Sequence, residues 1–383
     1  MAGIGIYFKQ NLSEIETLNT YNNNIVKFFL VVDYMLHGSA LKAVIKVDNE
    51  KPFEITPDTS GYFSFNFKNI ASKILNKNYF EDIIEPNAPY RYVELDESVY
   101  KEITVKYTVY WENLRFETVS KTYSFIKAVE QLEDYKIGRR NLINKDIAIL
   151  SELDRNSNLT YHLTYFEGYP FDIPIFSKAD RDVLIKNKDN GHSEAFPLKK
   201  GVNRLFVSDG SSNFSLETKL PIHLGSNELE MTSGDTTITL FLTKKDSSCG
   251  VYLKWFNNHG GWNYFLFKKS IENRSFKSAN TIDRDFQSLE NTISTTIDTT
   301  IISKDIISFY AKGLTFNEKQ VLNGISESLK IYRYLRCMFE VASLNNWLPE
   351  TLATRRISLQ DANRDIYQVA MSLNKTKRNT MSL

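Results

Sequence analysis

The stretch Cys249–Phe267 constrains the fold of this chain more than any other. It reads CGVYLKWFNNHGGWNYFLF, with two aromatic-rich runs on either side of Asn257–Gly261. Asn and Gly adopt positive φ at low cost, so this central segment is typical of the turn of a β-hairpin. Apolar residues alternate along both arms, which predicts two half-buried strands. They are Val251, Leu253 and Trp255 on the first arm, and Trp262, Tyr264 and Leu266 on the second.

The remainder of the chain is also typical of β-sheet. Aromatic residues make up 13% of the 383 residues, with 25 Phe and 21 Tyr, and short alternating runs recur between turn-forming residues. A chain of this length has room for more than one core. We therefore predict a mainly β protein with two β-sandwich-like domains and a short amphipathic helix near the C-terminus. The predicted parts are an N-terminal β-sandwich at 1–130, a polar linker at 131–155, a C-terminal β-rich domain at 156–375 and a flexible tail at 376–383.

Individual runs predict most of the strands. In the first domain these are Ile25–Val32, Leu41–Val47 and Ile103–Trp111, the last with the cleanest alternation in the sequence. In the second domain we expect strands at Leu159–Phe166, Leu216–Leu224 and Thr236–Leu242. Two prolines place Gly168–Ile175 at a sheet edge or domain rim. The Ser-, Thr- and Asn-rich segment Phe276–Thr300 predicts an exposed loop with one or two edge strands.

A capping box marks the predicted helix at 315–330. The side chain of Thr315 can accept a hydrogen bond from the Glu318 amide, and the Glu318 carboxylate can reach back to the Thr315 amide. Apolar residues then recur at helical spacing and form the face expected to be buried. They are Val321, Leu322, Ile325 and Leu329.

Charge and cysteine content narrow the classes of function. Lys and Arg (47) nearly balance Asp and Glu (46), so the chain has no overall positive field to hold nucleic acid. Two cysteines, Cys249 and Cys337, cannot form a disulfide framework, and we expect both to be small buried apolar residues. The N-terminus lacks the features of a secretory signal, and no run is long enough to span a bilayer. We expect a protein made in the cytoplasm, without a membrane anchor.

No arrangement of residues predicts catalysis. The five histidines lack the spacing of a zinc site, and no nucleophile elbow or phosphate-binding loop is present. Acidic pairs such as Glu81–Asp82 and Asp283/Asp285 leave a hydrolase open as a remote alternative, because sequence adjacency does not give the separation that the mechanism requires. We therefore expect no enzyme activity, no cofactor and no metal.

The aromatic residues of the hairpin allow two interpretations. Trp255 and Trp262 can stack on a sugar ring, or they can pack into the core of the sheet, where large aromatic side chains contribute most apolar area. We prefer the core. Gly260 and Gly261 belong to the turn, Tyr264 to the second arm, and His259 is expected to be an ordinary exposed turn residue.

The hairpin and the helix together resemble a known group of proteins. Cys249–Phe267, followed by AKGLTFNE at 311–318 and by DANRDIYQVAMSL at 361–373, is similar to structural proteins of tailed phages that infect Bacteroidetes, including crAss-like phages. The similarity covers roughly residues 156–375 and implies no catalytic residues. It implies a virion component of the tail, collar or baseplate.

This resemblance sets the leading hypothesis. It implies a non-enzymatic protein of the virion, made in the host cytoplasm, that forms a ring or collar by self-association and by contacts with other tail or head–tail proteins. Homo-oligomeric rings are a common outcome of repeated self-association. The alternative is a carbohydrate-binding or adhesion module with an aromatic platform at Trp255 and Trp262. The candidate structural or interaction residues are Trp255, Trp262, Tyr264, Gly260, Gly261, Thr315 and Glu318.

Overall fold

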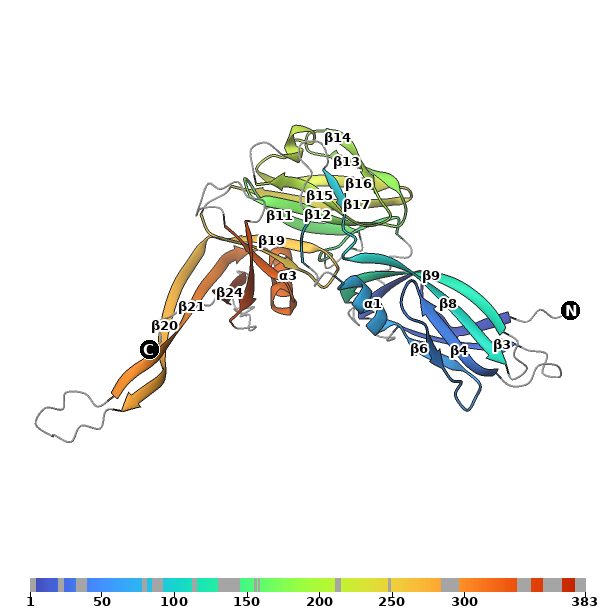
Figure 1. Cartoon of the computed structure of the whole chain (residues 1–383). Helices are drawn as coiled ribbons and strands as arrows, with labels where there is room; N and C mark the ends of the chain where they lie inside the picture. Colours follow the sequence, from blue (N-terminus) through green and yellow to red (C-terminus); the bar gives the residue numbers. More distant parts are fainter. Residues whose placement is uncertain are drawn as a thin grey trace, which may run out of the picture. The chain divides into compact units, whose positions relative to one another are not determined.

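The predicted fold class is confirmed, because the chain is mainly β, with several sheets and the α-helices α1 and α3 in the described part (Figure 1). The computed structural model describes residues 5–19, 24–31, 40–77, 81–84, 92–111, 116–129, 145–154, 157, 159–210, 215–246, 249–283, 296–335, 346–353 and 367–375. Cys337, the tail at 376–383 and most of the predicted linker lie outside these residues. The predicted domain boundaries therefore remain a prediction.

The chain divides into two compact units. Unit 1 contains Met1–His162, Gly168–Lys244 and the short segment Asn258–Trp262. Unit 2 contains Leu163–Glu167, Lys245–Asn257 and Asn263–Leu383. The turn of the central hairpin is therefore assigned to unit 1 and most of its two arms to unit 2.

The N-terminal part of unit 1 is a β-sandwich. Its first sheet has the order β1–β3–β6, with strands at Gly5–Gln10, Ile25–Val31 and Phe63–Asn66. Its second sheet has the order β2–β9–β8–β4–β5, with strands at Ile15–Asn19, Phe116–Val129, Tyr100–Trp111, Ala40–Val47 and Phe53–Ile55. Helix α1 (Lys68–Leu75) follows β6. Phe28 of the first sheet meets Tyr107 of the second edge-on, with ring centroids 5.1 Å apart.

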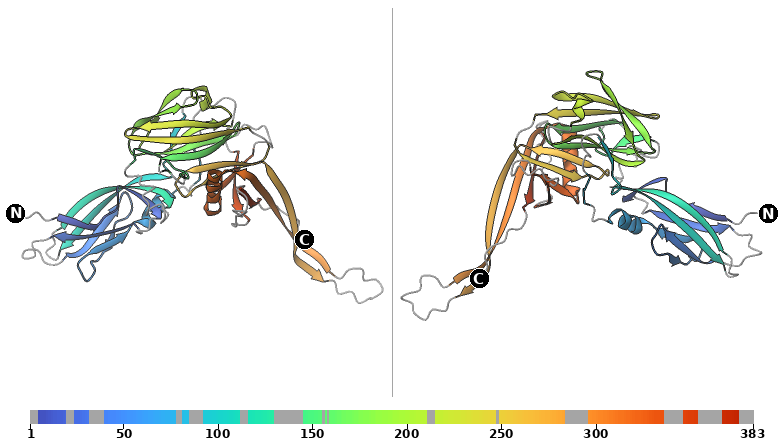
Figure 2. Two further views of the ribbon diagram at one scale, coloured as in Figure 1. Left: turned by 180° about the vertical axis from the view of Figure 1, so that it is seen from behind. Right: turned by 45° about the horizontal axis from the view of Figure 1, so that its top comes forward.

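Two further sheets make up most of the remainder of unit 1, although residues 163–166 of β11 are assigned to unit 2. The four-stranded sheet has the order β10–β12–β15–β7, with strands at Ile147–Ile149, Pro170–Ser177, Gly201–Asp209 and Val93–Leu95. The five-stranded sheet has the order β11–β17–β16–β13–β14, with strands at Thr160–Phe166, Thr236–Lys245, Gly225–Ser233, Arg181–Asn187 and Ser193–Leu198. Figure 2 shows these sheets from two further sides.

Strand β12 as a whole lies between β10 and β15, but only Ile175 of the segment Gly168–Ile175, predicted at a sheet edge or domain rim, pairs with β10. The ladder with β10 ends at the pair Ile149–Ile175, so Pro174 lies just beyond it. The missing N–H of Pro174 therefore removes no bond from that ladder, and its carbonyl accepts a hydrogen bond from the Leu150 amide at 2.9 Å. Strand β10 itself falls within the segment predicted to be a polar linker, and all three of its residues are buried.

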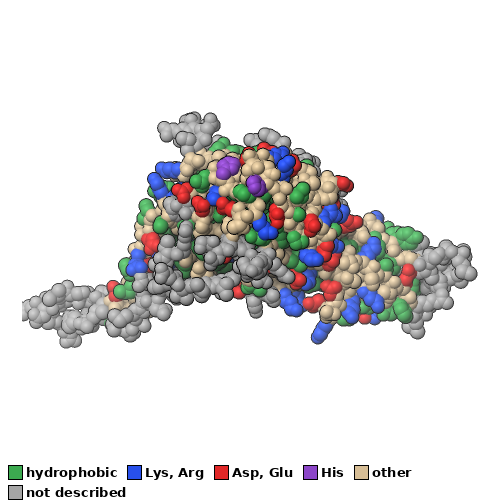
Figure 3. All heavy atoms as spheres, turned by 90° about the horizontal axis from the view of Figure 1, so that it is seen from above, with side chains coloured by type: hydrophobic (Ala, Val, Ile, Leu, Met, Phe, Trp, Pro, Cys, Tyr) green, Lys and Arg blue, Asp and Glu red, His purple; other side chains and the backbone are tan. Residues whose placement is uncertain are grey.

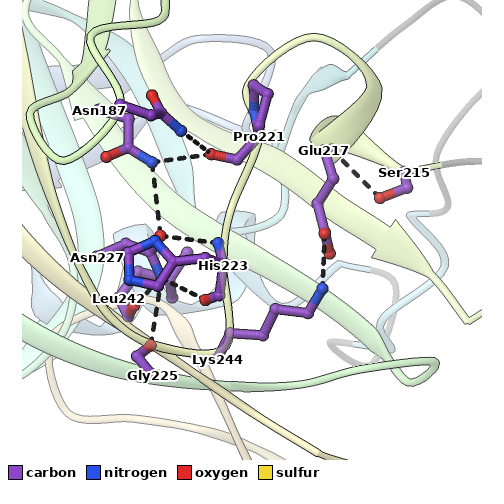
Figure 4. A network of polar contacts seen from close by, with 10 residues as sticks. Asn187, Ser215, Glu217, Pro221, His223, Gly225, Asn227, Leu242 and Lys244 are labelled. Atoms are coloured by element: carbon purple, nitrogen blue, oxygen red, sulfur yellow. Dashed lines mark hydrogen bonds and ion pairs between the residues drawn. The ribbon is translucent and has the colours of Figure 1, made fainter.

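The strand predicted at Leu216–Leu224 is wrong. Leu216–Thr218 forms a 3-10 turn in which the Glu217 amide donates to the hydroxyl of Ser215, and the following residues are held by buried asparagine side chains (Figure 4). The Asn227 amide donates to the carbonyls of His223, Gly225 and Leu242. Asn187 donates to the Pro221 carbonyl at 2.8 Å. Side chains satisfy this backbone, so it needs no neighbouring strand.

Unit 2 is organised by a seven-stranded sheet of order β19–β18–β22–β23–β24–β21–β20. The strands are Trp262–Phe267, Val251–Phe256, Ile331–Tyr334, Trp347–Leu352, Tyr367–Asn374, Thr296–Leu314 and Lys269–Asp283, in that order. Helix α3 runs from Phe316 to Glu327, so it ends three residues before the predicted end. Leu329 therefore lies beyond its end and is exposed, unlike the other apolar residues of the predicted face.

Candidate functional site

The arms of the central hairpin are core strands and not a ligand platform. β18 and β19 are neighbours in the sheet, as predicted. The expected half-burial is wrong, because residues on both faces of each arm are buried. Trp255, Trp262 and Tyr264 are all buried, so no indole face is open to a sugar. The preferred interpretation, core packing, is confirmed.

The turn of the hairpin is also buried, which corrects the exposed position expected for His259. Only 4% of His259 is exposed, and its Nε2 lies 2.5 Å from the Glu152 carboxylate. Gly260 has a φ of +88° that favours glycine, and the Asn258 carbonyl accepts a hydrogen bond from the Val129 amide at 2.7 Å. A Cβ added at Gly261 would lie 2.3 Å from the Leu150 carbonyl oxygen. The glycines thus permit close packing inside unit 1.

The capping box of α3 is confirmed. The Thr315 hydroxyl accepts from the Glu318 amide at 3.2 Å, and the Thr315 amide donates to Glu318 at 3.0 Å. Glu318 also accepts from Thr164 and Lys245, so it links three segments of unit 2. Burial opposes ionisation of Glu318, but the bond to Lys245 and its charge outweigh burial and hold the pKa of the carboxyl below its usual value.

The candidate residues of the hairpin are therefore buried, whereas Thr315 is exposed and Glu318 is partly buried. In the described part of the chain, no group of three or more His, Cys, Asp or Glu residues is placed to hold a metal ion. Cys249 corrects an expectation, because it is exposed and free. Within the same described ranges, no helix is both long enough and apolar enough to cross a membrane.

The long strands β20 and β21 of unit 2 form a candidate interaction surface. β20 and β21 form a long antiparallel pair, and β21 also pairs with β24, but only from Ile306 onward. The outer halves, residues 274–283 and 296–305, have no third strand among the residues that the structure describes. We call this two-stranded segment the ribbon. Figures 1 and 2 show it extending from its sheet.

The ribbon and its base expose large apolar side chains. They are Ile271, Phe276, Ile282, Ile301 and Ile302. Phe276 has 66% of its surface exposed, and it faces Ser303 in the register while Ser278 faces Ile301. Phe276 and Ile301 are thus diagonal neighbours on one face, close enough for side chains to touch.

Ion pairs link neighbouring segments on the ribbon and at its base. Arg274 donates two hydrogen bonds to Asp305 on the facing strand, at 2.8 and 3.0 Å. At the base, Lys375 pairs with Glu272 at 2.6 Å. Because large apolar side chains are exposed along it, the ribbon fits contact with another protein more than binding of a charged small molecule.

The sequence contained a signal for this surface that polar composition obscured. Phe276–Thr300 is rich in Ser, Thr and Asn, which favours a loop. The structure forms two long strands on either side of 284–295, which lies outside the described residues, and the expected edge strand is confirmed by β20, the last strand of its sheet. Isolated Phe and Ile residues within this polar run were the available indication of strands with exposed apolar side chains.

Comparisons with known proteins give no family. No protein-family model matches the chain, and no curated protein matches it. Among solved structures, a titin fragment is 13% identical with a TM-score of 0.25, covering 63% of this chain and 99% of the fragment. A bacterial ice-binding adhesin is 10% identical with a TM-score of 0.19, covering 80% of this chain and 93% of the adhesin structure. Domains 4–9 of the surface layer protein SbsC are 10% identical with a TM-score of 0.20, covering 97% of this chain and 43% of that structure. Similarities this weak carry no argument about function.

Proposed function

We propose that this chain is a non-enzymatic structural protein of a tailed-phage virion, and that it self-associates through the ribbon into a ring or collar. The observation that carries the proposal is the exposed apolar surface of β20 and β21. The resemblance of Cys249–Phe267 and of 311–318 to phage structural proteins is the reason for proposing that the particle is a phage virion. Neighbouring tail or head–tail proteins are the other expected partners.

The energetics of the ribbon favour a partner. A two-stranded antiparallel segment is at best marginally stable in water, because too little apolar surface is buried to offset the entropy of ordering it. Complete burial of a Phe or Ile side chain stabilises by about 1.5–3 kcal/mol. Docking of Phe276 and Ile301 against a second copy would therefore stabilise both the ribbon and the assembly.

The outer edge of the ribbon adds a second mode of contact. β20 is the last strand of its sheet, so in the described part of the molecule one row of its N–H and C=O groups has no strand partner. Such an edge pairs readily with a strand of another chain. Register irregularities next to Asn280 interrupt the ladder, which limits uniform pairing along the edge. We therefore expect the apolar face, with Phe276, to dominate the contact.

The test is the oligomeric state of the purified full-length chain, measured by mass photometry and sedimentation over a range of concentrations. We expect a closed oligomer, and we expect Phe276→Ser to weaken association by about tenfold or more, as the loss of one half-buried aromatic contact implies. Phe116→Ser is the matched control, because Phe116 lies on a strand of unit 1 and is 65% exposed.

A wild-type chain that stays monomeric at high concentration would overturn self-association. Equal weakening by both variants would instead show that the ribbon has no special role. The assignment to a phage virion is tested separately by gene context. We expect adjacent genes for portal, tail-tube or fibre proteins.

A further inference from the structure

The outer face of sheet β1–β3–β6 carries an aromatic row that neither self-association nor the core requires. Tyr7 of β1 faces Phe29 of β3 in the register, with ring centroids 6.2 Å apart and planes tilted by 30°. Phe29 in turn meets Tyr62 edge-on at 5.2 Å. Tyr7 is 52% exposed, and Phe29 and Tyr62 are partly exposed. The opposite face of the same sheet holds the buried Phe28 and Phe63.

Two lysines lie beside this row. The ammonium groups of Lys9 and Lys27 each lie 4.5 Å from the centre of the Tyr62 ring. Lys9 stands at a register shift in β1, between Phe8 and Gln10, and its ammonium lies 3.5 Å from the Tyr62 hydroxyl. Such irregularities commonly redirect a side chain. We call Tyr7, Phe29, Tyr62, Lys9 and Lys27 the aromatic–lysine strip.

The strip is held in place by the turn that precedes Tyr62. The Asp58 carboxylate accepts hydrogen bonds from the amides of Tyr62 and Ser60, both at 2.9 Å. Asp58 also lies 3.5 Å from Lys27, and Gly61 has a φ of +78°. The tyrosine is thus positioned by the backbone before any ligand binds, which reduces the entropy cost of binding.

The chemistry of the strip fits one class of ligand. Aromatic faces pack on the apolar C–H faces of sugar rings, tyrosine hydroxyls can hydrogen-bond sugar hydroxyls, and ammonium groups pair with carboxylates. Lys27 also lies 3.5 Å from Asp58, so the strip holds two ammonium groups and one carboxylate, which suits a single sugar carboxylate. Binding of nucleic acid relies on many basic groups that follow the phosphate backbone. Figure 3 shows acidic and basic side chains interspersed on the face it displays, without a broad basic surface there.

We propose that the aromatic–lysine strip binds an acidic polysaccharide, with Tyr7 and Phe29 stacking on sugar rings and Lys9 and Lys27 pairing with a carboxylate. This site is independent of self-association through the ribbon. The proposed sugar site therefore consists of exposed rings of the first domain, and not of Trp255 and Trp262, which are buried.

The test is isothermal titration of the full-length chain with hexamers of galacturonic acid, mannuronic acid and hyaluronan, and with neutral maltohexaose. We expect at least one acidic hexamer to bind and maltohexaose to bind more weakly. Tyr7→Ser and Lys9→Gln are each expected to reduce affinity about tenfold, as loss of one stacking or one charged contact implies. Phe116→Ser should leave binding unchanged.

The opposite results are equally defined. Failure of all three acidic hexamers, or binding that is insensitive to Tyr7→Ser and Lys9→Gln, would overturn the proposal. Tight binding of a single-stranded oligonucleotide that is lost in the same variants would show a nucleic-acid site instead. Circular dichroism and thermal melting check that each variant is folded, and neither result depends on whether the ribbon self-associates.

Discussion

At the scale of single residues, unit 1 encloses an unusual concentration of charge. Buried Arg204 pairs with Asp82 at 2.5 Å and with Asp172 at 2.6 Å, and both carboxylates are fully buried. Asp96 is also buried and feels the charge of Arg204. Burying ions is costly unless they are paired, and here three carboxylates share the field of one guanidinium. Asp96, the third carboxylate, is therefore the one expected to reduce stability when it is charged.

The pKa of Asp96 carries a testable consequence. Burial raises this pKa above its usual 3.8, against the opposing effects of Arg204 and Ser98. A raised folded-state pKa means that the folded chain binds the proton more tightly, so Asp96 makes stability fall as pH rises from about 3.8 through the raised pKa. We expect Asp96→Asn to stabilise the protein at neutral pH and to leave it unchanged at low pH. Denaturant unfolding across this range measures the effect.

Asp146 supplies a control with the opposite sign. Its carboxylate accepts a hydrogen bond from the Asp235 amide at 2.8 Å and pairs with Arg181, and these lower its pKa. Its stabilising effect is present above the usual pKa and lost as pH falls through the lowered one. Asp146→Asn should therefore destabilise the protein at neutral pH. A stabilising Asp146→Asn, or a destabilising Asp96→Asn, would contradict the assignment.

The glycines of the central hairpin give a second residue-scale prediction. Gly261→Ala would drive a methyl group against the Leu150 carbonyl and against Pro174, at 2.3 and 2.5 Å. We expect a loss of about 1–3 kcal/mol in the free energy of unfolding, typical of overpacking. Gly324→Ala is the matched control, because it lies within α3 and its added Cβ would be 3.5 Å from Trp255 Nε1, an ordinary contact. It should stabilise by about 0.5–1 kcal/mol.

At the scale of elements, helix α3 depends on its first turn. Thr315→Ala removes the side-chain acceptor for the Glu318 amide and should cost about 1 kcal/mol. Thr315→Ser keeps the acceptor and should cost much less. Denaturant melts of the two variants distinguish these outcomes, and an equal loss in both would show that the methyl group matters more than the cap.

Elements with a strong local pattern could be predicted from the sequence. β3, β8 and α3 were found because a compact apolar run, alternation or capping is visible within a few residues. Prediction failed where distant contacts decide the structure. Leu216–Leu224 is apolar enough for a strand, but Asn187 and Asn227 hold its backbone in another conformation. The pairing of β12 with β10 also depends on distant residues, and it begins only after Pro174.

The two proposed surfaces were harder to predict for the same reason. Trp255 and Trp262 attract attention in the sequence, yet they are buried. Tyr7, Phe29 and Tyr62 are unremarkable along the chain and become a row only when β1, β3 and the turn before β6 are adjacent. His259 is similar, because it is buried in contact with Glu152, far away in sequence. Exposure is a property of the fold and not of local composition.

At the scale of the whole molecule, the two proposed surfaces differ in their response to salt. With 47 basic and 46 acidic residues, the chain has little net repulsion to oppose self-association. Contacts through Phe276 and Ile301 are apolar, so we expect the oligomer to persist, or to strengthen, at about 1 M salt, where screening extends to about 3 Å. Binding of an acidic hexamer through Lys9 and Lys27 should fall sharply over the same range. Mass photometry and titration on one protein sample compare the two responses. An oligomer that dissociates in salt would show that ion pairs, and not the apolar face of the ribbon, hold the copies together.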